Sequence, residues 1–155
     1  AGVCQAGVTE GKERPMSRVI LLAADRPLPL LEPAFRRVRC TGRFTVETDG
    51  FSVRPHEYYR GAVDELGLEL KPFQYELDLE ATQEDVNALR AYLAGHCRPG
   101  EQVELWNLWV GVDREDQVSR FQGELADLAL DTLEQLCFPP VERDCPGQCR
   151  LTVTI

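Results

Sequence analysis

The alternation of hydrophobic and polar positions changes its period along the chain, and each change predicts an element. Residues 74–80 alternate apolar with polar, mainly acidic, side chains, which predicts a strand with one buried face. Thr82 with Asp85 three residues later resembles a capping box, and residues 86–93 then carry apolar side chains at helical spacing. Residues 102–110 carry large apolar side chains on both faces, which predicts a central strand.

Two further strands are predicted, one near each end of the chain. The run VILLAA at residues 19–24 is apolar throughout, which is typical of a buried first strand. Residues 151–155 alternate and predict a last strand. Residues 1–15 have no hydrophobic periodicity, so we expect a tail there and a single domain over residues 16–155, a length normal for one domain.

Between these strands, residues 37–47 alternate for eleven residues and predict one long strand, with Gly42 as a bend or bulge. The pair Asp49-Gly50 is the strongest short hairpin signal in the chain. Residues 51–53 are therefore expected to pair back on the preceding strand.

Two further helices are predicted. Pro55 suits the first turn of a helix that runs to about Leu66 and closes on Gly67. Asp113 is expected to cap another helix, whose apolar residues recur at three- and four-residue steps as far as Leu136. The elements together predict an α+β fold, a two-layer sandwich in which three helices lie mainly on one face of a mixed sheet of about five to six strands.

Composition restricts the classes of partner. The net charge of -9 argues against nucleic acid and anionic membranes, which both select basic surfaces. No stretch approaches the roughly 20 apolar residues that span a bilayer, and no signal peptide is apparent, so we expect a cytoplasmic protein. A basic protein partner remains compatible with the charge.

Common catalytic motifs are broken at identifiable positions. His56 and Glu57 begin like the zinc helix HExxH, but Arg60 stands where the second histidine is required. Ser52 lies in a GxSxG-like stretch that ends in Arg54. No dinucleotide or phosphate-binding glycine motif occurs, so the sequence predicts no cofactor and favours a non-catalytic protein.

Six cysteines occur along the chain. Cys137, Cys145 and Cys149 are weak candidates for a structural metal, because their spacing fits no zinc ribbon or finger. A labile disulfide between Cys145 and Cys149 is a second interpretation, and ordinary thiols packed as small apolar groups are the third.

Arginines cluster in one of the predicted strands. Arg37, Arg39 and Arg43 project from the same side of the alternating segment, and arginine forks bind carboxylates and phosphates. One hypothesis is a small enzyme or sensor that binds an anionic metabolite through this row, with His56 and Glu57 as acid/base candidates. The competing interpretation is that acidic strands of the same sheet neutralise the row through ion pairs.

A group of acidic residues is the basis of the hypothesis that we favour, a protein-binding surface. Glu124, Asp127, Asp131 and Glu134 would share one face of the predicted third helix, with no basic residue between Phe121 and Glu142 to offset them. They are interpreted either as a solubilising surface or as a docking surface for a basic protein.

In addition to these acids, the candidate aromatic anchors are Trp106, Trp109, Tyr58 and Tyr59. Exposed tryptophans would also permit a homodimer. In composition alone, the chain is similar to bacterial immunity proteins, which neutralise basic toxins. We therefore expect a small, acidic, soluble binding protein with a basic protein partner.

Overall fold

The computed structural model describes residues 17–110, 118–139 and 147–155. Its strands are β1 (Ser17–Ala24), β2 (Arg36–Thr41), β3 (Phe44–Asp49), β4 (Ser52–Pro55), β5 (Phe73–Asp78), β6 (Gln102–Val110), β7 (Val118–Glu124) and β8 (Gln148–Thr154). Its helices are α2 (Arg60–Asp64), α3 (Gln83–His96) and α4 (Leu130–Cys137), with a 3-10 turn η2 (Leu125–Asp127) before α4. None of the described helices is long and apolar enough to cross a membrane.

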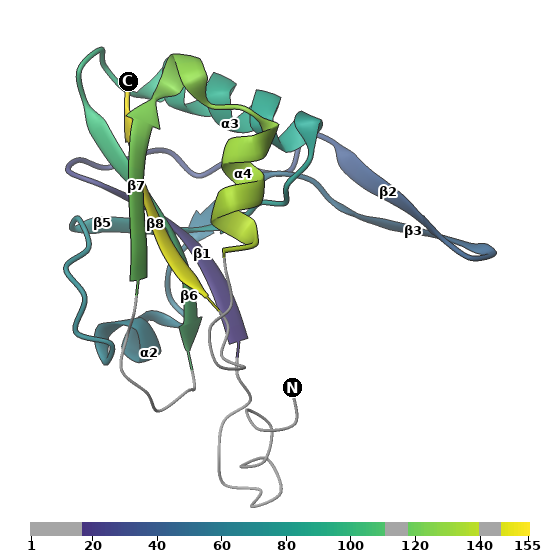
Figure 1. The fold of residues 1–155 in the computed structure, drawn as a ribbon, viewed down its shortest axis with the longest axis horizontal. Coiled ribbons are helices and arrows are strands. Elements are labelled where there is room, and N and C mark those ends of the chain that lie inside the picture. The colour runs from purple at the N-terminus through teal and green to yellow at the C-terminus, as the bar shows by residue number, and fades with distance from the viewer. Residues whose placement is uncertain (1–16, 111–117, 140–146) are drawn as a thin grey trace, which may run out of the picture.

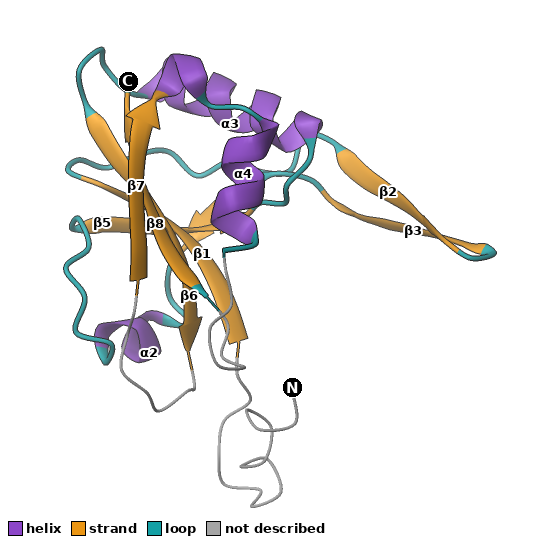
Figure 2. Cartoon of the chain, in the orientation of Figure 1, coloured by secondary structure: helices purple, strands orange, loops and turns teal. Residues whose placement is uncertain are grey.

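Six strands form one mixed sheet in the order β4-β5-β1-β6-β8-β7. All neighbours are antiparallel except β7 and β8, which run parallel at one edge. Strands β2 and β3 form a separate two-stranded sheet that projects from the body as a hairpin (Figures 1 and 2). The predicted α+β fold with a mixed sheet is confirmed.

Both faces of the central strands are buried, which explains their continuous apolar runs. On one face, Leu22 and Leu105 pack in a core with residues of α3 and α4. On the other face, Leu21 and Trp106 pack with α2 and the residues that follow it. Two of the three helices therefore lie on one face, and α2 covers part of the face that the sequence left open.

Helix α3 begins where the capping pattern predicts. The Thr82 hydroxyl accepts a hydrogen bond from the Asp85 backbone N–H, which satisfies one of the free donors at the helix start. Val86, Leu89 and Leu93 then face the core, as their spacing requires.

The predicted long strand over residues 37–47 is wrong, because the chain reverses at Gly42 and Arg43 and forms the β2–β3 hairpin. Gly42 has a φ of 62°, a conformation in which glycine carries no steric penalty. Thr41 pairs with Phe44 across the turn. The reversal moves Arg43 out of the row formed by Arg37 and Arg39.

The hairpin predicted at Asp49-Gly50 is also wrong, since β4 pairs with β5 and not with β3. Gly50 is needed for a close approach of the backbone. Its N–H donates to the Phe35 carbonyl at 2.8 Å, and a Cβ at this position would lie 2.6 Å from Phe35 atoms. The glycine thus marks the point where the chain leaves the hairpin and enters the main sheet.

The long third helix predicted from Asp113 to Leu136 is replaced by strand β7, turn η2 and the shorter helix α4. Residues 118–124 pair in parallel with β8, and this non-local pairing overrides the helical spacing. Asp113 lies outside the described residues. The helix predicted from Pro55 is limited to Arg60–Asp64, because Pro55 is the last residue of edge strand β4.

Candidate functional site

A groove lies on the face of the sheet that carries α4, between that helix and edge strand β7. It encloses about 160 Å³. Leu128, Leu151 and Val153 lie at its floor with only 1 to 3% of their surface exposed, and the half-buried Phe121 supplies apolar surface. Thr132 and Gln135 line it from α4. Glu124, Asp127 and Asp131 also line it, so we call this feature the acidic groove.

The groove is open at Gly123, a lining residue that carries no side chain. Gly123 of β7 lies opposite Val153 of β8. A methyl group added at Gly123 would meet no atom within 4 Å. The parallel register therefore leaves open space at the sheet edge next to α4.

Three different elements supply the carboxylates of the groove. Glu124 ends β7, Asp127 lies in η2, and Asp131 lies in the first turn of α4. Glu134 is exposed on α4 and does not line the groove. The predicted single helical face is therefore wrong in geometry, although three of its four acids converge on one hollow.

Arg90 of α3 holds the turn that presents Asp127. One guanidinium nitrogen, Nη1, donates to the backbone carbonyls of Leu125, Ala126 and Leu128 at 2.8 to 3.0 Å. Those carbonyls, which a 3-10 turn leaves partly unpaired, are satisfied in this way. The backbone of η2 is thus fixed while the Asp127 side chain remains exposed.

The four acidic residues predicted as a docking surface are not paired with basic side chains among the described residues. Glu124, Asp127, Asp131 and Glu134 are all exposed, and none forms an ion pair or a side-chain hydrogen bond within the part of the chain that the structure describes. Asp131 gains some stabilisation from the partial positive charge at the start of α4. The groove therefore presents uncompensated negative charge beside apolar surface.

The two tryptophans predicted as aromatic anchors lie outside the acidic groove. Trp106 is 1% exposed in the core under α2, where its Nε1–H donates to Glu104 at 3.1 Å and Arg150 lies over its ring. Contrary to the expectation, Trp106 cannot anchor a partner from that position. Trp109 is half-buried on β6, and neither tryptophan lines the acidic groove.

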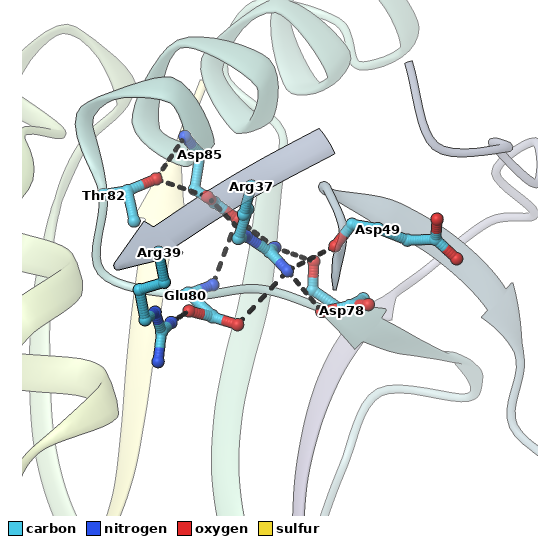
Figure 3. A network of polar contacts seen from close by, with 7 residues as sticks. All are labelled: Arg37, Arg39, Asp49, Asp78, Glu80, Thr82 and Asp85. Atoms are coloured by element: carbon cyan, nitrogen blue, oxygen red, sulfur yellow. Dashed lines mark hydrogen bonds and ion pairs between the residues drawn. The ribbon is translucent and has the colours of Figure 1, made fainter. Parts of the chain in front are cut away.

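Arg37 belongs to a buried polar network at the base of the hairpin (Figure 3). Its side chain is 5% exposed, and its Nε and Nη2 donate to the two oxygens of Asp85 at 3.1 and 2.6 Å. Asp78, Glu80 and the Asp49 carbonyl accept further bonds from its Nη1. Burial alone would lower the pKa of Arg37, but the hydrogen bonds to Asp85 and Asp78 outweigh it and raise that pKa above its ordinary value.

The rest of the predicted anion site does not converge. Arg39 forms an ion pair with Glu80, and Arg43 lies exposed at the hairpin turn. His56 is buried, with its Nδ1 3.2 Å from Glu76. A second hollow of about 350 Å³ is lined by Arg18, Arg54 and three carboxylates, but by none of these four predicted residues.

Three of the four described cysteines are buried free thiols. Burial raises the pKa of Cys137 and of Cys149 to about 11, and it raises the pKa of Cys97 as well. No group of three metal-ligating side chains occurs among residues 17–110, 118–139 and 147–155. Cys145, part of both the metal and the disulfide interpretations, lies outside those residues.

No protein family, no curated protein and no solved structure matches this chain.

Sequence reasoning missed two features that the structure places on the surface. The lining residue Gly123 gives no signal until its register with Val153 is known. The projecting hairpin, with Phe44 at its tip, was signalled only by Gly42 inside the alternating segment.

Proposed function

We propose that the protein is a non-catalytic binding protein that holds a basic segment of a partner in the acidic groove. The observation that carries this proposal is the set of three exposed carboxylates, Glu124, Asp127 and Asp131, which line one hollow without an internal cation among the described residues. Such a site selects a cation by charge and accepts an apolar group on its floor.

The chemistry of the groove defines the partner more closely. The half-buried Phe121, beside a floor of buried Leu128, Leu151 and Val153, favours contact with an aliphatic or aromatic side chain. Carboxylates at the rim favour arginine, whose planar fork donates to two oxygens at once. A segment in which arginine adjoins an apolar residue therefore fits better than a run of lysines. The net charge of -9 adds long-range attraction for such a segment.

The anion-binding alternative has less support. The Arg37 guanidinium already donates to three carboxylates and two backbone carbonyls, and Arg39 is paired with Glu80. A metabolite would have to displace these contacts, including one with the fully buried Asp85. Breaking a buried ion pair in this way costs about 3–5 kcal/mol.

Titration with a fluorescein-labelled peptide of alternating arginine and phenylalanine tests the proposal, with fluorescence anisotropy as the readout. We expect saturable binding that weakens about threefold to tenfold in the double variant Asp127→Asn, Asp131→Asn, because exposed ion pairs contribute about 0.2–1 kcal/mol each. A matching glutamate and phenylalanine peptide should not bind.

The control is the double variant Asp64→Asn, Glu69→Gln, which removes the same charge from exposed positions at and after α2. It should bind the basic peptide like the wild type. Equal weakening in both double variants would reduce the effect to net charge and overturn the assignment of the groove. Absence of binding to the basic peptide would remove the proposed function itself.

A further inference from the structure

The β2–β3 hairpin is almost entirely exposed. Every residue of β3 is exposed, and in β2 only Arg37 is buried. Val38, Phe44 and Val46 are large apolar residues with exposed fractions of 62%, 77% and 46%. An isolated two-stranded hairpin is at best marginally stable in water, so a hairpin of this kind gains stability when another surface covers it.

The base of the hairpin is fixed while its tip is free. Arg37 in β2 donates to the carbonyl of Asp49, the last residue of β3, and to the buried Asp85 of α3. Arg37 thereby ties both strands to the body, and the ion pair between Arg39 and Glu80 adds a second contact. Strands of this length extend about 20 Å at roughly 3.4 Å per residue, so the tip stands well clear of the sheet (Figure 1).

The tip combines one cation with one aromatic side chain. Arg36 is paired within the hairpin with Glu47 and Asp49, and Arg39 is paired with Glu80. Arg43 is exposed and forms no ion pair within the described residues. Its neighbour Phe44 is the most exposed of the three apolar residues on the hairpin.

We propose that the hairpin tip of one copy of this chain docks in the acidic groove of a second copy. This inference rests on the proposed function and names the partner of that site. Arg43 would meet the carboxylates of Asp127 and Asp131, and Phe44 would cover the apolar floor. Charge and apolar surface are complementary at both ends of the contact, and the anchored base reduces the conformational freedom lost on binding.

The two surfaces lie on opposite sides of the molecule. In Figure 1 the hairpin tip is at one end of the long axis, and β7 stands on the far side of α4 from it. A tip therefore cannot reach the groove of its own chain, and docking joins different copies. Because tip and groove are different patches, the contact is head-to-tail and generates rings or open chains of copies.

Two double variants separate the partners of this contact. The arm variant Arg43→Ser, Phe44→Ser keeps its groove, and the groove variant Asp127→Arg, Asp131→Arg keeps its arm. Sedimentation velocity over a concentration series should show reversible higher oligomers for the wild type, and each variant alone should associate at least about tenfold more weakly. Mixed in equal amounts, the two variants should form a capped one-to-one dimer, since one intact tip and one intact groove remain.

A matched control is the double variant Tyr58→Ser, Arg60→Ser, which changes an exposed aromatic residue before α2 and the exposed arginine that begins α2. It should assemble like the wild type. Circular dichroism and thermal melting verify that every variant is folded.

A wild type that stays monomeric throughout the series overturns the inference, and so does an arm variant that still assembles or a variant mixture that forms no dimer. The basic peptide separates this failure from failure of the proposed function. Retained peptide binding in a monomeric wild type would leave the groove as a site for another basic protein. Absence of peptide binding to the wild type would overturn both the docking inference and the proposed function.

Discussion

At the scale of single residues, the fold depends on a buried arginine whose donors are all used. Each of the three guanidinium nitrogens of Arg37 donates to an acceptor, and the closest contacts are 2.6 Å, to an Asp85 carboxylate oxygen and to the Asp49 carbonyl. Asp85 itself has no exposed surface. A buried pair of this kind adds little net stability compared with apolar residues of the same volume, but loss of one partner is costly.

We predict that Asp85→Ala lowers the free energy of unfolding by about 3–5 kcal/mol, because Arg37 is left buried without its closest carboxylate. Urea denaturation measures the change. Arg39→Ala, which removes an exposed partner of Glu80, should cost less than about 1 kcal/mol.

The double variant Arg37→Met, Asp85→Leu removes both buried charges and should recover more than half of the loss. If the single and double variants are equally unstable, the ion pair is not the origin of the effect.

A second residue-scale prediction concerns acid stability. Hydrogen bonds from Arg26 at 2.7 Å, followed by one from the Arg98 backbone, lower the pKa of Glu101 to about 2 from its ordinary value of 4.5. The folded state therefore binds this proton less tightly than the unfolded state. Its stabilisation is present above about pH 4.5 and is lost as the pH falls toward about 2.

Glu101→Gln should consequently be less stable than the wild type at neutral pH, and the difference between them should narrow as the pH falls through this range. Urea denaturation at several pH values gives the comparison. A difference that stays constant with pH would show that the carboxylate charge is not involved.

At the scale of elements, the sequence predicted correctly those elements whose signals lie within a few neighbouring residues. The cap at Thr82 and the apolar run of β6 were enough to place α3 and the central strand. The three- and four-residue apolar spacing at residues 118–124 predicts a helix, but the same residues also fit a strand with few buried positions. Only the pairing with β8, which no local pattern encodes, decides between the two.

The hairpin shows a related limit. Alternation continues through the two-residue turn at Gly42, so the segment reads as one strand. After the turn, directly paired residues share a face, and Val46 joins the side of Arg39. For the candidate site, the sequence identified the acids Glu124, Asp127 and Asp131 but could not show that they converge on one groove.

Exposure of the hairpin leads to a prediction at this scale. Arg37 is the one buried residue of β2 and β3, whereas β1 and β6 lie at the centre of the sheet. We expect backbone amides of β2 and β3 to exchange hydrogen much faster than those of β1 and β6, because local opening of the hairpin exposes little apolar surface. Hydrogen–deuterium exchange with mass spectrometry, performed on dilute protein, measures this. Equal protection would show that the hairpin unfolds only with the whole sheet.

At the scale of the whole molecule, a net charge of -9 opposes self-association even where two surfaces are complementary. Copies of the chain repel one another at long range, while Arg43 and the groove carboxylates attract only at contact. The two effects respond differently to salt, since the screening length falls from about 30 Å at 0.01 M to about 8 Å at 0.15 M and about 3 Å at 1 M.

Self-association should therefore be weak at about 0.01 M salt, strongest near 0.15 M, where repulsion between the bodies is screened, and weaker again at 1 M, where the contact itself is screened. Binding of the basic peptide should instead weaken steadily over the same range, because body and groove both attract it. Sedimentation velocity measures self-association and fluorescence anisotropy measures peptide binding, both in the same series of buffers. A steady decline of self-association from the lowest salt would contradict a short-range contact between two repelling copies, and no change with salt would exclude Arg43 as its charged partner.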